Sequence, residues 1–310
     1  MKSLLLVLLA SVVLPFGAVA QISVADSSAQ CVAYWSKGDT MTYNVTTSKL
    51  KVKGADTTLA EQGSYTVDII VLDSTAKSYT LVWVYRNYEF GSDNPIVQKL
   101  ADMYKDMTVK VKTDEMGAMT EVVNWKELRD NSNKFYKQLL KEVKELNELP
   151  GFKAMMDQMM KNFSSKEAIE SLAVADVQQF HSFHGAAYTL NEEIAGRLKV
   201  PNFLGGAPFD ADVTLMMEEL NVEEGNYVLR MTEAVDSEQL TQATFDYLLT
   251  MASSMGVDPP RREVLKSLEN VVETAARIHE SGWPLYTVQT KTVSGEGIVQ
   301  IEERVIELMD

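Results

Sequence analysis

Apolar and polar residues alternate along the first third of the chain in the manner of β-strands. The alternating stretches are rich in β-branched and aromatic residues, and Gly, Asp, Ser or Lys cluster in the short turns between them. The predicted strands are residues 31–34, 41–47, 64–72, 78–90, 108–113 and 119–123. Because most successive strands are joined by short turns, we expect antiparallel hairpins.

One predicted strand is apolar on both faces. Large side chains stand at Tyr79, Leu81, Trp83 and Tyr85, and valines occupy two of the positions between them. A strand covered on both sides lies inside a sheet, with one face turned to the core or to a ligand.

The pattern changes to helical at Asn124. Apolar residues then recur every three to four positions up to the Pro150-Gly151 break, and Asn124 with Glu127 has the spacing of a capping box. A second helix is predicted over residues 152–163 and a third over 164–185, the latter starting at a Ser164–Glu167 capping box. Residues 124–185 are therefore predicted to form a helical layer inserted between strands.

The second half of the chain repeats this order of elements. An apolar loop over residues 196–210 precedes a hairpin, two helices and a last hairpin. The hairpins are residues 212–220 with 227–235 and residues 285–293 with 298–308, and the helices, 237–256 and 258–282, form an insertion at about 237–281. The repeated order suggests a weak internal duplication, with halves 21–195 and 196–310.

Together these elements predict an α+β fold. We expect one large curved antiparallel sheet with two inserted helical layers, built as a single β-rich domain over residues 21–310. Such a domain can bury a core without disulfides, which a chain with one cysteine cannot form internally.

The N-terminus has the pattern of a cleaved export signal. A lysine precedes an apolar run over residues 4–14, and Ala18-Val19-Ala20 has the small-x-small form of a cleavage site before Gln21. The mature chain has no further apolar run long enough to span a membrane, and its lone Cys31 lacks the approach of a lipid-anchoring site. We therefore expect residues 1–20 to be removed and the protein to be periplasmic or secreted.

Composition excludes several functions. The formal net charge of −15 disfavours nucleic acid as a partner. HExxH, GxSxG and phosphate-binding loop motifs are not found in the sequence, so no cofactor is expected and an enzyme is the less favoured reading.

Three marked turns support a resemblance. Residues 35–39 (WSKGD) lead into Tyr43-Asn44-Val45, residues 113–117 (TDEMG) lead into Asn124-Trp125, and Gly282-Trp283-Pro284 opens the last hairpin. In these features the chain resembles uncharacterised exported β-rich bacterial proteins. In element order it is also similar to the lipoprotein-carrier half barrel, which implies a curved sheet that encloses an apolar ligand under helices.

Two local groups could serve as ligand sites. His181 and His184 lie three residues apart, on one face of a helix, and could share a metal with a nearby carboxylate; two histidines near a helix C-terminus also interact favourably with its last carbonyls. The methionines of residues 155–160 could bind copper, fill a core, or form an adaptable lid over a ligand. If they form a lid, Met155 and Met159 are the residues expected to contact the ligand.

The function that these features favour is non-catalytic binding of a hydrophobic or lipid-like ligand in a cleft between the curved sheet and the helices. The candidate ligand-binding residues come from the sheet, the methionine-rich helix and the apolar loop: Tyr79, Leu81, Trp83, Tyr85, Met155, Met159, Phe203 and Phe209. Two alternatives stay open. One is a structural or interaction protein of the bacterial envelope, and the other is an envelope hydrolase or metal-binding protein.

Overall fold

A computed structural model describes residues 22–91, 107–142, 160, 164–170 and 174–309 of the chain. The predicted export signal and the methionines Met155 and Met159 lie outside these residues. Within the described part, no helix is long and apolar enough to cross a membrane.

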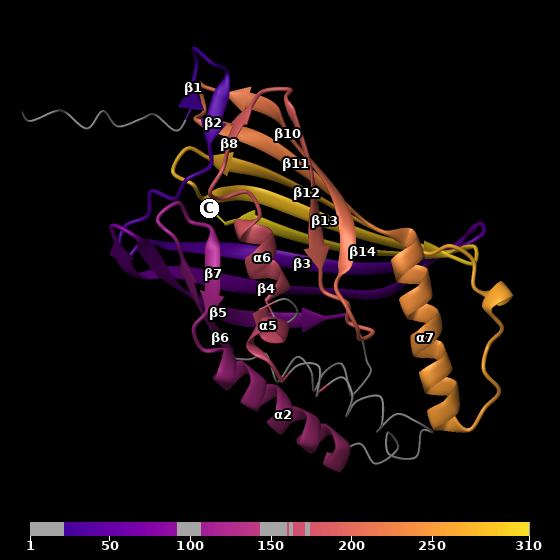
Figure 1. Cartoon of the computed structure of the whole chain (residues 1–310). Helices are drawn as coiled ribbons and strands as arrows, with labels where there is room; N and C mark the ends of the chain where they lie inside the picture. The colour runs from indigo at the N-terminus through magenta and orange to yellow at the C-terminus, as the bar shows by residue number, and fades with distance from the viewer. Residues whose placement is uncertain (1–21, 92–106, 143–159, 161–163, 171–173, 310) are drawn as a thin grey trace, which may run out of the picture.

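The protein is α+β, and an open, curved antiparallel sheet of 11 strands dominates it (Figure 1). From edge to edge the order is β7-β6-β5-β4-β3-β14-β13-β12-β11-β10-β9. The strands of the first half are β3 (Thr40–Lys53), β4 (Asp56–Thr75), β5 (Ser78–Phe90), β6 (Thr108–Thr113) and β7 (Met119–Val122). Those of the second half are β9 (Glu193–Val200), β10 (Phe209–Asn221), β11 (Asn226–Val235), β12 (Glu269–His279), β13 (Pro284–Gly295) and β14 (Ile298–Leu308).

Each half of the sheet is an up-and-down meander, and the first and last strands join the two. β3 pairs with β14 from Tyr43 opposite Leu308 to Lys53 opposite Ile298. A separate three-stranded sheet, β1 (Ile22–Ser23), β2 (Ser28–Gln30) and β8 (Ala187–Thr189), stands beside the ends of β10 and β11 (Figure 1). The internal duplication stays a prediction.

The helices lie on one side of the large sheet. They are α2 (Trp125–Glu142), α5 (Lys166–Ala168), α6 (Ala175–His181) and α7 (Ser237–Met255), with a 3-10 turn at Arg262–Val264. α6 packs on β13 and β14, and α7 contacts β10 and β12 (Figure 1). We call the side of the sheet that α6 covers the inner face.

Two apolar clusters hold these layers together. The larger packs the inner face of β3–β6 against α6, with Trp35 and Trp283 at its border. The smaller joins the three-stranded sheet to β10–β12 through Cys31, Phe183, Tyr188 and Tyr227, among others. Large buried side chains on alternate strand positions thus face a helix or the small sheet, as a half-covered antiparallel sheet requires.

The four predicted hairpins that follow residue 64 are confirmed, as are the starts of two helices. α2 begins directly after Asn124, although the Asn124 side chain bonds mainly to β6, accepting from the Lys110 N–H and donating to the Thr108 carbonyl. α7 begins after Asp236, whose carboxylate accepts the Gln239 N–H at 2.8 Å. The predicted Ser164 cap is displaced by one residue, because the Ser165 hydroxyl accepts the Ala168 N–H.

The predicted helix over residues 258–282 is wrong, so the second helical insertion is shorter than 237–281. Residues Glu269–His279 form β12, which pairs with β11 on one side and β13 on the other. Val271, Val272 and Thr274 favour a strand, and Thr274, Ala276 and Ile278 are buried at alternate positions. The apolar spacing fits a helix equally well, and pairing on both sides decides between the two.

Two smaller predictions are also corrected. Residues 196–200, predicted as loop, belong to β9, so the loop is confined to residues 201–208. Residues 31–34 form no strand in a ladder; their N–H groups bond to three separate segments, at the carbonyls of Ala186, Met116 and Ser281.

Candidate binding face of the sheet

The four residues predicted on β5 lie in the closed core. Tyr79, Leu81, Trp83 and Tyr85 are at most 9% exposed. The Tyr79 hydroxyl donates to the Ala33 carbonyl at 2.9 Å, and the Trp83 ring meets Phe180 of α6 edge to face at 5.3 Å. These side chains therefore bind α6 and the Cys31–Trp35 segment to the sheet, and in this structure they are covered.

α6 is fixed to the inner face by polar contacts as well. The Tyr65 hydroxyl donates to the Asp176 carboxylate at 2.9 Å, and the Gln179 amide donates to the Arg304 carbonyl and the Thr287 hydroxyl. Burial holds the pKa of the Tyr65 hydroxyl well above its usual value, and the neighbouring Asp176 charge adds to the effect. Tyr65 therefore stays a neutral donor to a buried carboxylate.

His181 and His184 are buried and each bonds one backbone carbonyl. His181 Nδ1 lies 2.8 Å from the Gly117 oxygen, and His184 Nε2 lies 2.8 Å from the Gly282 oxygen. A carbonyl only accepts, so these two nitrogens carry the protons. Burial lowers the pKa of His181 to about 3 and that of His184 to about 4, so both rings are neutral at pH 7.

The surroundings of the two histidines are aromatic. Trp35 lies 5.9 Å from the His181 ring and 5.5 Å from the His184 ring, and Phe180 packs on both. Among the described residues, no three His, Cys, Asp or Glu side chains are grouped as metal ligands. The contacts give the histidines a structural role between α6 and two turns.

An aromatic ladder extends from the core along β5. Tyr85, Tyr88 and Phe90 follow one another with nearly parallel rings, at 6.3 Å and 6.1 Å between centroids, and Tyr65 stacks on Tyr88 at 4.8 Å. Asn87, with a φ of 53°, interrupts the alternation and lets Tyr88 and Phe90 share the side of Tyr85. The sequence reasoning missed these two rings, although an asparagine inside a strand is a sign of such a bulge.

A second apolar wall lies on the inner face of β9–β11. Directly paired residues of antiparallel strands point to the same side, so the register places Ile194, Leu215 and Met231 in one row that ends at the buried Thr274 of β12. Ile194 is 47% exposed and Leu198, two positions along β9, is 37% exposed. This wall is therefore apolar yet accessible.

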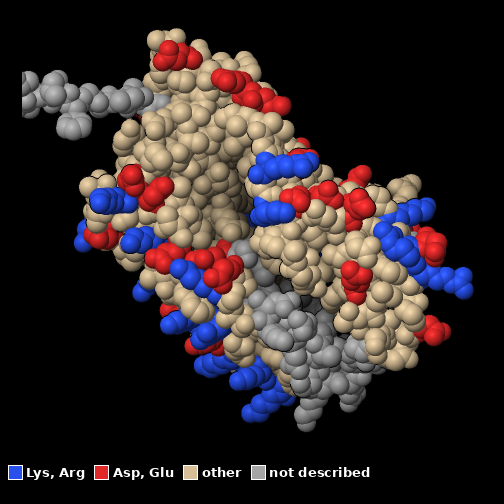
Figure 2. Space-filling model, in the orientation of Figure 1, with Lys and Arg blue, Asp and Glu red and all other residues tan. Residues whose placement is uncertain are grey.

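Figure 2 shows that this face of the molecule is hollowed beside β9 and β10, and that the surface of the hollow is free of charged side chains in this view. Charged groups gather on the rim of the hollow (Figure 2). On β9 and β10, Arg197 pairs with Asp212 at 2.6 Å and Lys199 with Asp210 at 2.7 Å. By register these four residues belong to the outer face.

A polar row crosses the middle strands of the sheet, one register step beyond the row that joins Phe90 to Met231. Across β4, β3, β14 and β13 the register aligns Glu61, Lys49, Glu302 and Lys291, with alternating charge. Lys49 Nζ lies 2.9 Å from Glu302 Oε1, and this contact raises the pKa of the lysine. The four charges compensate one another, and the same row continues through Val272 of β12 to Glu233 of β11, where burial raises the pKa of the carboxyl group.

A groove of about 1100 Å³ opens between α7 and the loop of residues 201–208. The Gln239 side chain fixes α7 to the start of β10, where this loop ends, since it accepts the Asp210 N–H and donates to the Asp210 carboxylate, both at 2.8 Å. The predicted Phe209 lines this groove and is buried, whereas Phe203 of the same loop is 46% exposed and is not among the lining residues. The apolar side of the groove consists of Leu204, Ala207, Pro208, Phe209, Ala243, Tyr247 and Met251.

Comparisons with known proteins identify no family for this chain. No family model and no curated protein matches the chain. A solved structure described as "Lipid-protein interactions in lipovitellin" aligns with 89% of this chain and 25% of its own, at 9% sequence identity and a TM-score of 0.39. The chain thus spans about a quarter of that protein, and the candidate site rests on this chain's own residues.

Proposed function

We propose that the protein binds a hydrophobic or lipid-like ligand between the curved sheet and its helices, without catalysis. The observation that carries the proposal is the accessible apolar wall of Ile194, Leu198, Leu215 and Met231 on the inner face. Apolar side chains left open on the concave side of a sheet gain free energy when a guest removes them from water.

The α7 groove supports the same proposal. Its volume of about 1100 Å³ is of the size that small-molecule sites reach, and its lining combines apolar side chains with about as many polar ones, among them the acidic Asp236, Glu238 and Asp246. The compensated charges of the polar row suit a neutral or zwitterionic guest better than a strongly charged one. We also propose that the protein works outside the cytoplasm, after removal of residues 1–20.

A direct test is native mass spectrometry of the protein purified from its own envelope, combined with thermal unfolding in the presence of fatty acids, a lysophospholipid or mild detergent. Bound ligand is expected to raise the unfolding temperature with its concentration. No co-purified molecule together with no stabilisation by any of these amphiphiles would overturn the proposal.

Matched variants locate the site. Leu215→Gln on the inner wall is expected to weaken binding about tenfold, because a buried leucine contributes on the order of 1.5–3 kcal/mol. Thr214→Gln, the neighbouring exposed residue on the outer face of β10, is the control and should leave affinity unchanged. Ala243→Trp fills the α7 groove and reports whether the ligand also occupies it. Equal affinities for the two β10 variants would place binding elsewhere.

A further inference from the structure

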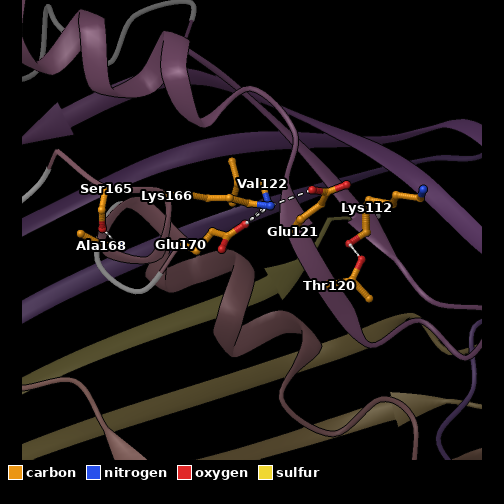
Figure 3. A network of polar contacts seen from close by, with 8 residues as sticks. All are labelled: Lys112, Thr120, Glu121, Val122, Ser165, Lys166, Ala168 and Glu170. Atoms are coloured by element: carbon orange, nitrogen blue, oxygen red, sulfur yellow. Dashed lines mark hydrogen bonds and ion pairs between the residues drawn. The ribbon is translucent and has the colours of Figure 1, made fainter. Parts of the chain in front are cut away.

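The two edges of the large sheet differ in how their backbone groups are covered. At the β7 edge, Glu170 Oε1 accepts the Val122 N–H at 2.7 Å, and Lys166 forms ion pairs with Glu121 at 2.8 Å and Glu170 at 3.7 Å (Figure 3). The chain leaves β7 directly into α2. Side chains and a following helix thus prevent another strand from adding to this edge.

The β9 edge has no such cover in the described part of the chain. Residues 193–199 are all exposed, and the backbone hydrogen bonds that the described residues give this strand run to β10. An exposed edge of this length is a template for a further strand.

Charges on β9 do not protect the edge either. Edge lysines and arginines usually keep strands apart because they repel and stay hydrated. Here Arg197 and Lys199 are each neutralised by an aspartate of the adjacent β10, at 2.6 Å and 2.7 Å. With these two cations paired, β9 has little free positive charge that would repel a second strand.

The sequence of β9 is complementary to itself. When two copies run antiparallel about a two-fold axis at Gly196, Glu193 of one lies opposite Lys199 of the other, and Ile194 lies opposite Leu198. Each of these pairs occurs twice. Gly196 stands at the axis, where no heavy atom lies within 4 Å of the position that a Cβ would occupy, so the centre of the interface is open.

We propose that β9 is an interaction strand for a second copy of this chain, paired antiparallel about Gly196. The contact is isologous, so it closes into a dimer and does not propagate into a fibre. It also joins the inner walls of the two subunits through four apolar residues, and it stands independently of the ligand proposed above.

Disulfide trapping tests the register. Directly opposed residues of antiparallel strands have Cα atoms about 4.5–5.5 Å apart, within the range that a disulfide spans. Gly196→Cys should therefore crosslink two chains on mild oxidation, since the natural Cys31 is buried. Leu198→Cys is the control, because the two copies of residue 198 lie about 14 Å apart in this register. We expect covalent dimer from the first variant at least about tenfold faster than from the second.

A charge swap tests the pairing without a covalent bond, using light scattering over a dilution series. Glu193→Lys should raise the dimer dissociation constant roughly tenfold because it places like charges opposite each other twice. The double variant Glu193→Lys with Lys199→Glu should restore the dimer, although Lys199→Glu still disrupts the pair with Asp210 inside each chain. Glu303→Lys, exposed on the outer face of β14, is the matched control and should dimerise as the unaltered chain does.

Three results would overturn the proposal. They are a monomer up to the highest soluble concentration, equal crosslinking of the two cysteine variants, and a charge swap that fails to restore the dimer.

Discussion

His184 of the first half of the chain is bonded to Gly282 of the second half, with 2.8 Å between the ring Nε2 and the carbonyl oxygen. The contact links the residues after α6 to the turn between β12 and β13. The ring donates through Nε2, and burial, which lowers the pKa of His184 to about 4, makes the neutral form the one that the fold selects. The consequence is a pH dependence of stability.

We predict that acid destabilises the protein partly through His181 and His184. The pKa values of the two histidines in the folded protein are about 3 and about 4, below the usual 6.5. Between pH 4 and pH 6.5 the unfolded chain therefore binds protons that the folded chain does not. The stabilisation is complete above pH 6.5 and is lost as the pH falls toward 4. For His184 the loss is on the order of 3 kcal/mol.

Urea unfolding at pH 7 and pH 5 measures this effect. His184→Gln should reduce the difference in the free energy of unfolding between the two pH values. An unchanged pH slope in His184→Gln would contradict the assignment.

Gly282 is predicted to tolerate no side chain. Its φ is 82°, and a Cβ would lie 2.9 Å from the Ala33 Cα and closer still to the Val32 carbonyl oxygen. Gly282→Ala should cost about 3 kcal/mol or more, because it combines a left-handed backbone with a clash against backbone atoms. Gly297→Ala, with a φ of 73° and open space around it, should cost only about 1 kcal/mol. Chemical denaturation of the pair measures the difference, and equal losses would refute the clash.

Cys31 should be unreactive in the folded protein. The thiol is buried, and burial raises its pKa to about 12, so almost no thiolate forms at pH 8. Labelling with a thiol reagent should therefore be slow in buffer and fast in denaturant. Rapid labelling of the native chain would show that the Cys31–Trp35 segment opens locally.

Removing the cover of the β7 edge should weaken that end of the sheet. Glu170→Ala leaves the Val122 N–H without its acceptor, and we expect a loss of about 1–3 kcal/mol together with faster hydrogen exchange at Val122. Glu167→Ala, an exposed glutamate of α5, removes the same charge without touching the Val122 N–H, so it is the control for exchange at Val122. Exchange at Val122 that stays slow in Glu170→Ala would mean that other groups protect this edge.

Strands and helices could be predicted from the sequence where the residue pattern fits only one kind of element. Turn residues and alternation were sufficient for the hairpins, and Asp236 and Gly256 mark both ends of α7. The segment of β12 carries two signals, since its apolar spacing fits a helix and its valines fit a strand. Only its neighbours in the sheet select the strand, and a single sequence does not name those neighbours.

The candidate site was harder to predict for a related reason. The pattern at Tyr79–Tyr85 correctly indicates an apolar strand, but apolar residues that face a helix and those that face a ligand look alike in a sequence. α6 covers these four, while Ile194, Leu215 and Met231 remain accessible on strands that looked ordinary. Strand order and register decide which apolar faces stay open, and both depend on contacts distant in the chain.

The ladder between β3 and β14 also constrains when the protein can fold. Tyr43 pairs with Leu308, so β3 is synthesised long before its partner β14, and until then one whole side of β3 has no neighbour. Closing so long a loop is slow, and an unpaired strand edge in the meantime invites aggregation. The open side of β3 is therefore closed only when β14 has been made and the two meanders meet.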